Sequence, residues 1–166
     1  MNTDGFYLID KPVGWTSFDV CAKLRGIFGV KRIGHTGTLD PFATGLLIVA
    51  VGKTTKLIPF LEKDRKSYVT KIKLGVTSDT LDPTGELEEL EKECANDETI
   101  QCADIEKVLK EKFIGKIQQV PPKYSALKVN GKKLYELARE GKDVEIKSRE
   151  AEVFGAKVLS YEYPYI

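Results

Sequence analysis

The sequence predicts an α+β fold in which a mixed, mostly antiparallel sheet is flanked by helices. Apolar and polar side chains alternate over Tyr68–Val76, which is the period of a half-buried strand. Apolar side chains within Val20–Phe28 recur instead at the spacing of an amphipathic helix. The predicted strands outnumber the helices and do not alternate regularly with them, which disfavours a parallel βαβ arrangement.

The first 61 residues predict four elements. Thr16 or Ser17 caps the first helix, which ends near Gly29. Pro59 is compatible with a later short helix only if a new turn starts there. In chain order we expect a strand over Phe6–Ile9, the capped helix, a buried strand over Leu46–Val51 and a short helix over Thr54–Leu61.

The second half predicts a loop and an acidic surface segment, followed by strands and helices. Asn130-Gly131 between apolar residues is a strong hairpin signal. The expected elements after Tyr68–Val76 are a loop over Ser78–Gly85, an acidic segment over 86–98, a helix from Asp104 to Gly115, a strand over Lys116–Val120, a hairpin from Ser125, a helix over Lys132–Glu140 and a strand over Val153–Tyr161. We find neither a repeat nor a linker, and we expect one domain, 1–166.

Composition excludes several classes of protein. The 42% hydrophobic and 31% charged content of the 166 residues is ordinary for a globular protein, and no apolar run approaches the ~20 residues of a membrane helix. Three cysteines and one histidine form neither a disulfide framework nor a zinc site, so we expect no metal. Met1-Asn2-Thr3-Asp4 does not begin a secretory signal, and a cytoplasmic location is expected.

Charge is unevenly distributed behind a net value of +1. Residues 1–75 carry 12 Lys and Arg against 6 Asp and Glu, whereas residues 76–98 carry 1 Lys against 9 acids. A basic first half favours a polyanionic partner, because Lys and Arg neutralise phosphates. The alternative is an ordinary solvated surface.

The segment Gly34–Gly45 concentrates three glycines, the only histidine and an aspartate in twelve residues. Pro41 fixes its own φ and keeps Asp40 out of the helical region, so the loop is predicted to be stiff. A rigidly held carboxylate can act as a nucleophile or a base. The competing interpretation is an Asp-Pro turn in which Asp40 only closes the turn.

The segment G-H-T-G-T-L-D-P-F-A-T-G-L-L, residues 34–47, resembles the signature loop of the TruB family of tRNA pseudouridine synthases. Further segments agree with the family in order and spacing: Leu8–Pro12, Lys66–Val69, Tyr124–Lys128 and Gly131–Tyr135. The resemblance implies a pseudouridine-synthase catalytic domain. It also implies that Asp40 is the catalytic residue and that no cofactor is required.

The resemblance also implies roles for four other residues. Tyr68 matches a tyrosine that lies on the target base, and His35 matches a histidine that helps turn out the base or hold the RNA. Lys11 and Lys56 match basic positions that hold phosphate or orient the loop backbone. Ordinary structural roles compete with each: a core tyrosine, an imidazole bonded within its loop and solvated lysines. Four further basic residues are candidates for an RNA track: Lys128, Lys132, Lys133 and Arg139.

The implied activity is isomerisation of uridine to pseudouridine at position 55 in the T-arm of tRNA, by a monomer that needs no protein partner. Family members continue with a segment S-K-G-T-Y-I-R, whose arginine pairs with the catalytic aspartate, and with a C-terminal RNA-binding domain. This sequence stops at Ile166, before either, so we expect a catalytic domain truncated at its C-terminal end. Two alternatives are a non-catalytic tRNA-binding fragment and a dyskerin-like enzyme that depends on a guide RNA.

Overall fold

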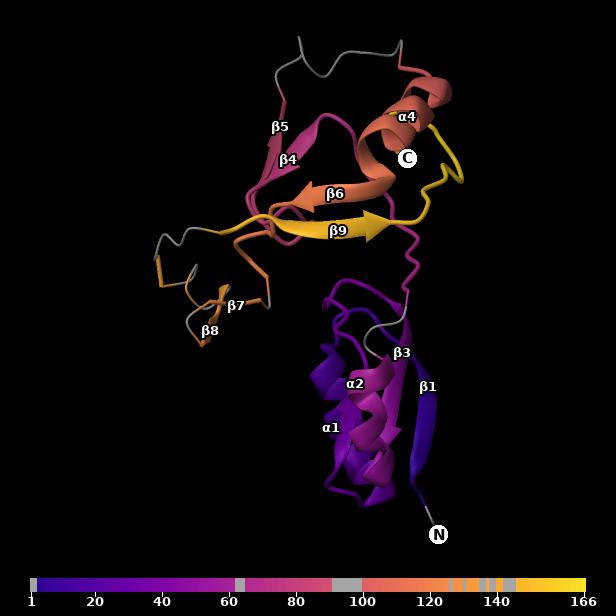
Figure 1. Cartoon of the computed structure of the whole chain (residues 1–166), viewed down its shortest axis with the longest axis vertical. Helices are drawn as coiled ribbons and strands as arrows, with labels where there is room; N and C mark the ends of the chain where they lie inside the picture. The colour runs from indigo at the N-terminus through magenta and orange to yellow at the C-terminus, as the bar shows by residue number, and fades with distance from the viewer. Residues whose placement is uncertain are drawn as a thin grey trace. The chain divides into compact units, whose positions relative to one another are not determined.

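The computed structural model describes residues 3–61, 65–90, 100–125, 127–129, 131–134, 137, 140–141 and 146–166. The chain divides into two compact units, Met1–Tyr68 and Val69–Ile166 (Figure 1). Within the described residues every strand pair is antiparallel, and helices accompany the strands in both units. This confirms the predicted α+β class.

The first unit is a three-stranded sheet with a helix on one face. Its central strand β3 (Gly45–Val51) lies between β1 (Gly5–Lys11) and β2 (Ile33–His35). The register places Tyr7 of β1 and His35 of β2 on either side of Val49. Helix α1 (Ser17–Phe28) packs on the same face, where Val20 and Cys21 join Val49 in the core.

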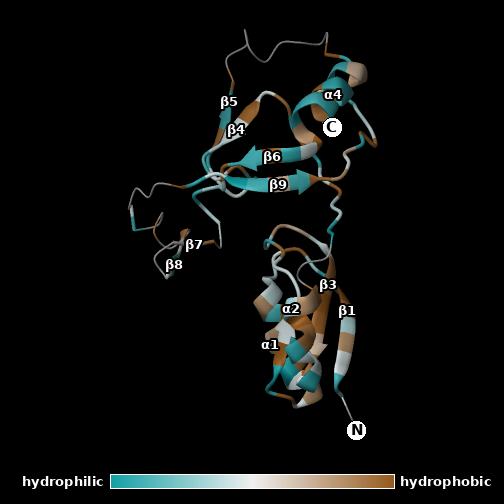
Figure 2. Ribbon diagram, in the orientation of Figure 1, coloured by the Kyte–Doolittle hydropathy of each residue, from teal (hydrophilic) through white to brown (hydrophobic). Residues whose placement is uncertain are grey.

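The strand β3 contributes half of the buried residues of this core cluster and appears in Figure 2 as a hydrophobic band. Leu47, Val49 and Val51 are at most 2% exposed. Burial of such a side chain contributes about 1.5–3 kcal/mol. On the opposite face Leu46 is 62% exposed, whereas Ala50 near the end of the strand is buried. The predicted buried strand is therefore buried on the α1 face, but on the other face it is buried only near its C-terminal end.

Capping residues set the limits of α1 as predicted. Thr16 is the N-cap, and it forms a reciprocal capping box with Asp19. Gly29 ends the helix with φ 64°, a left-handed conformation that glycine adopts without strain. After β3 the chain forms the 3₁₀ helix η1 (Gly52–Leu57) and the short helix α2 (Ile58–Leu61). Pro59 therefore lies in the first turn of a new helix, where its missing N–H is tolerated.

In its described part, the second unit contains three two-stranded sheets. Strands β4 and β5 flank the Ser78–Gly85 loop, and the pair β6 and β9 is the longest ladder of the unit (Figure 1). The bounds are β4 (Val76–Ser78), β5 (Leu87–Glu89), helix α4 (Cys102–Val108), the π-helical turn η2 (Leu109–Phe113), β6 (Gly115–Gln119), β7 (Lys128–Val129), β8 (Lys132–Lys133) and β9 (Arg149–Val153). The β7–β8 pair is the hairpin predicted from Asn130-Gly131.

Two predicted strands are wrong. Over Tyr68–Val76 only the last residue is in a strand, and main-chain hydrogen bonds connect Ile72 and Leu74 with Ile166 and Pro164. Alternation specifies which side chains share a face, but a strand also needs a partner for its hydrogen bonds. The last strand covers 149–153 instead of Val153–Tyr161, because its partner β6 begins at Gly115, opposite Val153.

Some predictions fall wholly or partly outside the described residues. These are most of the acidic segment 86–98 and most of the helix over Lys132–Glu140, including Arg139. Leu134 and Leu137 of that predicted helix are described, and both are buried. Of the described helices, none combines the length and apolar character needed to cross a lipid bilayer.

Candidate active site

Asp40 lies on the loop between β2 and β3 and is exposed. Within the described residues no hydrogen bond or ion pair involves its carboxylate. Its main-chain carbonyl accepts a hydrogen bond from the N–H of Ala43 at 3.1 Å, which closes a tight turn through Pro41. The sequence prediction of a turn that presents a carboxylate is therefore confirmed in geometry, and the chemical role of Asp40 stays a prediction.

Lys11 anchors the segment that follows Asp40. Its side chain is fully buried at the end of β1, and its ammonium donates hydrogen bonds to the carbonyls of Trp15 at 2.6 Å and Pro12 at 3.1 Å. A third, longer bond reaches the carbonyl of Pro41 at 3.4 Å, and the N–H of Gly14 donates to the same oxygen at 2.7 Å. The resemblance implied that Lys11 either holds phosphate or orients the loop backbone. This geometry fits the second role.

Ser17 anchors the segment that precedes Asp40. Its hydroxyl accepts a hydrogen bond from the N–H of Leu39 at 2.9 Å and lies 3.3 Å from the Leu39 carbonyl, to which it can donate. The sequence prediction considered Ser17 only as a helix cap. The signal that could have separated the two residues is the spacing of Thr16 and Asp19, which fits a capping box and leaves Ser17 free.

His35 and Lys56 take different positions in the first unit. His35 is in β2, with its side chain on the α1 face, and its Nδ1 is buried with no hydrogen-bond partner in the described part of the chain. It is therefore not, in this structure, an imidazole bonded within its loop. Lys56 is exposed in η1. An exposed ammonium there is available to a phosphate.

Tyr68 is 70% exposed and lies outside any helix or strand. Its side chain makes no hydrogen bond or ring contact with any residue that the structure describes. The interpretation as a core tyrosine is therefore wrong, because such exposure excludes core packing. An exposed aromatic ring is suited to stacking against a base.

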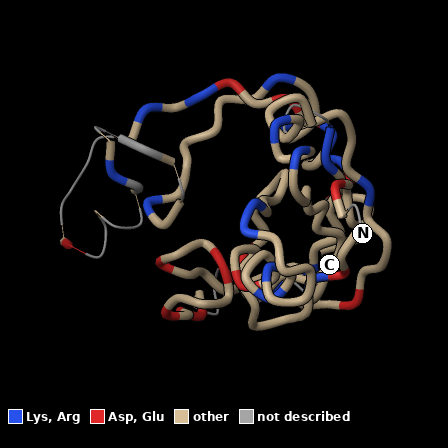
Figure 3. The backbone as a smooth tube through the Cα atoms, turned by 90° about the horizontal axis from the view of Figure 1, so that it is seen from below, with Lys and Arg blue, Asp and Glu red and all other residues tan. Residues whose placement is uncertain are grey.

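The basic residues considered for an RNA track are only partly described. Lys128 and Lys133 pair across the β7–β8 hairpin, and their side chains lie outside the described part. Lys132 forms an exposed ion pair with Glu140 at 3.3 Å. Figure 3 shows Lys and Arg at several separate places along the described tube and not on one element.

A loop in the second unit is built around Asp82. Its carboxylate accepts hydrogen bonds from the hydroxyls of Thr80 at 2.8 Å and Thr84 at 2.5 Å, and from the N–H of Thr84 at 2.8 Å. Burial raises the pKa of Asp82, but these hydrogen bonds outweigh it and leave the pKa below its ordinary value. The carboxylate is thus ionised and engaged in holding the loop.

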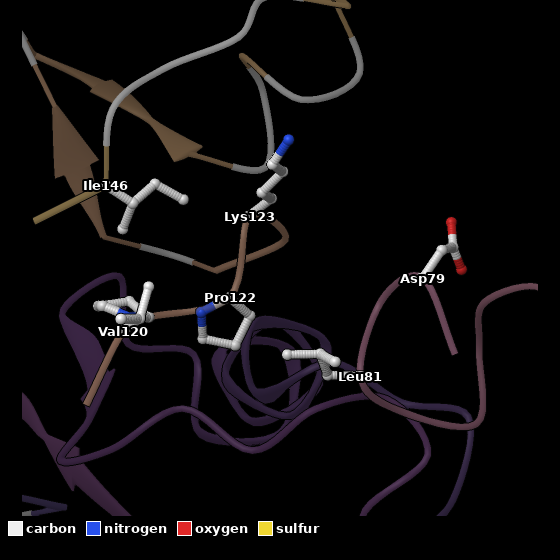
Figure 4. A pocket seen from close by; sticks show the side chains of 7 residues that line it. Asp79, Leu81, Val120, Pro122, Lys123 and Ile146 are labelled. Atoms are coloured by element: carbon white, nitrogen blue, oxygen red, sulfur yellow. The ribbon is translucent and has the colours of Figure 1, made fainter. Parts of the chain in front are cut away.

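The same unit has an open hollow of about 500 Å³, whose lining is shown in Figure 4. Leu81, Pro122 and Ile146 line it, with Asp79 and Lys123 as its charged residues. The Asp79 carboxylate already accepts a hydrogen bond from the main-chain N–H of Glu86 at 2.8 Å. We therefore place no acid–base chemistry in this hollow.

Asp40 therefore differs from Asp79 and Asp82. Its exposed carboxylate has no partner among the described residues, and its backbone is held on both sides by the buried side chains of Lys11 and Ser17. A carboxylate with these properties can attack an electrophilic carbon or remove a proton.

Curated relatives match nearly the whole chain. A protein of Clostridium novyi named tRNA pseudouridine synthase B is 48% identical over 98% of this chain and 54% of its own length. A protein of the same name from Oenococcus oeni is 49% identical over 90% of this chain and 49% of its own length. The chain spans about half the length of the curated relatives it matches.

A solved structure supports the fold. A chain in the crystal structure of a Cbf5-Nop10-Gar1 complex superposes with a TM-score of 0.60 and 25% identity, over 97% of this chain and 37% of that one. The sequence pattern of the TruB family pseudouridylate synthases (N-terminal domain) matches residues 25–166. On this match, which covers most of its length, the chain belongs to the TruB family of pseudouridylate synthases.

Proposed function

We propose that this chain carries the catalytic aspartate of a synthase that isomerises uridine to pseudouridine in tRNA. The observation that carries the proposal is the exposed carboxylate of Asp40, which has no partner among the residues that the structure describes and lies on a loop whose backbone is anchored on both sides. The names of the relatives, tRNA pseudouridine synthase B, support the reaction and the class of RNA.

The reaction breaks the N-glycosidic bond of uridine, turns the base and rejoins it to the sugar through carbon 5, with loss of the proton at that carbon. The Asp40 carboxylate can serve this sequence in three ways: attack on C1′ of the sugar, addition to the base, or removal of the C2′ proton. Each requires an ionised carboxylate held in place. The two anchors beside Asp40 provide the second requirement.

Uridine 55 in the T-arm is the proposed target, and a monomer in the cytoplasm is the proposed form of the protein. Tyr68 supports an extruded base in this proposal, because its 70% exposed ring is free to stack. Lys56 is exposed and available to a phosphate. His35 Nδ1, buried and unpartnered within the described residues, is a group that RNA can engage only after a local rearrangement.

Release of tritium from [5-³H]uridine in unmodified tRNA tests the proposal, since carbon 5 loses its hydrogen when the new bond forms. The 166-residue chain is expected to release tritium without added cofactor, from wild-type T-arm but not from tRNA that carries another base at position 55. Absence of release at saturating protein would overturn the proposal for this chain. A matched Asp40→Asn chain controls for a contaminating enzyme.

A non-catalytic RNA-binding role is the second candidate. It is favoured by the absence, among the described residues, of a cation paired with the Asp40 carboxylate. This role predicts tRNA affinity that falls steeply with salt, as phosphate contacts do, with no product formed. Filter binding at several salt concentrations, beside the tritium assay, separates the two.

A guide-RNA-dependent synthase is the third candidate, favoured by the similarity to a chain of the Cbf5-Nop10-Gar1 complex. Such an enzyme requires partner proteins and a guide RNA. Activity of the isolated chain on free tRNA excludes it.

A further inference from the structure

We propose that Ser17 is a positioning residue for Asp40, and that its buried hydroxyl sets where the carboxylate stands. The inference rests on the proposed function, since the position of Asp40 affects a rate only if Asp40 takes part in the reaction. Ser17 is 2% exposed, so its hydroxyl faces the protein and not the RNA.

The hydroxyl contacts both main-chain groups of the residue immediately before Asp40. Its oxygen accepts from the Leu39 N–H at 2.9 Å and lies 3.3 Å from the Leu39 carbonyl. Leu39 also packs its side chain against the core that α1 and β3 form. Ser17 therefore ties the loop main chain to the first residue of α1.

Ser17 is free to make these bonds because Thr16 caps the helix. The Thr16 hydroxyl accepts from the Asp19 N–H at 3.1 Å, and the Asp19 carboxylate accepts from the Thr16 N–H at 2.8 Å. The capping box satisfies the end of α1 without Ser17. Its hydroxyl is left for a partner outside the helix.

The two sides of Asp40 depend on different anchors. After Asp40, Pro41 has no N–H, and its carbonyl is held by Gly14 and Lys11. Before Asp40, the main chain is held by Ser17. Loss of the hydroxyl releases one side only, so the loop can shift while the fold remains, and a shift of about 1 Å at a reacting group costs on the order of 100-fold in rate.

Single-turnover kinetics with saturating tRNA test the proposal. Ser17→Ala is expected to lower the rate constant of pseudouridine formation by about 10- to 100-fold, with tRNA affinity unchanged. A purely structural role instead lowers the amplitude, because it reduces the fraction of folded protein. Thr16→Ala is the control: it removes the adjacent cap and lowers stability, but it leaves the Leu39 bonds and hence the rate constant. A Ser17→Ala rate constant equal to that of Thr16→Ala would overturn the proposal.

Hydrogen exchange of the Leu39 amide provides a readout that does not need turnover. Ser17→Ala is expected to accelerate exchange at Leu39 and to leave Thr36, whose N–H donates to the Ile48 carbonyl at 3.0 Å, unchanged. If the wild-type chain forms no product, the proposed function fails. Hydrogen exchange alone then tests the anchoring by Ser17. An exchange rate of the Leu39 amide that is the same in Ser17→Ala and wild type would overturn it.

Discussion

Lys11 Nζ donates a hydrogen bond to the carbonyl oxygen of Trp15 at 2.6 Å, although the lysine side chain has no exposed surface. A buried ammonium is stable only when it is hydrogen-bonded, and here carbonyl oxygens supply the bonds. Its further bond to Pro41, at 3.4 Å, connects the end of β1 to the residue after Asp40. Lys11 thus uses its ammonium to hold main-chain carbonyls beside the proposed site.

Replacement of this lysine tests that role. Lys11→Met keeps the length of the side chain but removes its donors, so we expect the free energy of unfolding to fall by about 1–3 kcal/mol. Urea denaturation measures the change. The exposed Lys56→Met is the control and should stay within about 0.5 kcal/mol of wild type. Equal losses for the two variants would contradict the assignment of Lys11 to the backbone.

Replacement of Asp40 by asparagine tests the catalytic role. Asp40→Asn should abolish turnover and leave tRNA affinity close to wild type, because the amide keeps the shape but removes the anion. Single-turnover rates and filter binding measure the two properties. Glu150→Gln, which neutralises an acid of the exposed Lys116–Glu150 ion pair on β6 and β9, controls for removal of a surface negative charge. If Asp40 only closes a turn, asparagine serves as well, and a rate within about tenfold of wild type, about 1.4 kcal/mol of barrier, would remove Asp40 from catalysis.

Two substitutions, one aromatic and one aliphatic, test whether Tyr68 stacks on a base. Tyr68→Phe keeps a stacking surface and should cost less activity than Tyr68→Leu, unless the hydroxyl itself transfers a proton. Base–aromatic stacking is worth about 1–3 kcal/mol, so the leucine variant should bind or react about 5- to 150-fold less well. Because the side chain is 70% exposed, neither change should affect the urea midpoint. Equal activities for the two variants would argue against stacking.

The capping box of α1 predicts a pH dependence of stability. Hydrogen bonds from the Thr16 hydroxyl and Thr16 N–H lower the pKa of Asp19 from its ordinary 3.8. A lowered folded pKa means that the stabilisation is complete above 3.8 and is lost as the pH falls through the folded value. The difference in unfolding free energy between wild type and Asp19→Asn should therefore be constant from neutral pH to about pH 5 and shrink below 3.8. A difference that grows on acidification would contradict the prediction.

Several local features of both units could be predicted from the sequence. Thr16 and Gly29 bound α1, Pro59 marks the restart of a helix, and Asn130-Gly131 marks a hairpin, because each of these depends on residues close in the chain. The motif around Asp40 also identified the family, which the match over residues 25–166 supports. The turn at Asp40 follows from Pro41 and was predictable for the same local reason.

The side chains that hold the Asp40 loop could not be predicted from the sequence. The bonds from Lys11 to Pro41 and from Ser17 to Leu39 span 30 and 22 residues, and no local pattern encodes such pairs. The predicted strand over Tyr68–Val76 failed for a related reason. Alternation sets the faces of a strand, but a strand forms only where one partner continues along it. Here Ile72 and Leu74 bond to residues 164–166, whereas Gly75 bonds to Leu90.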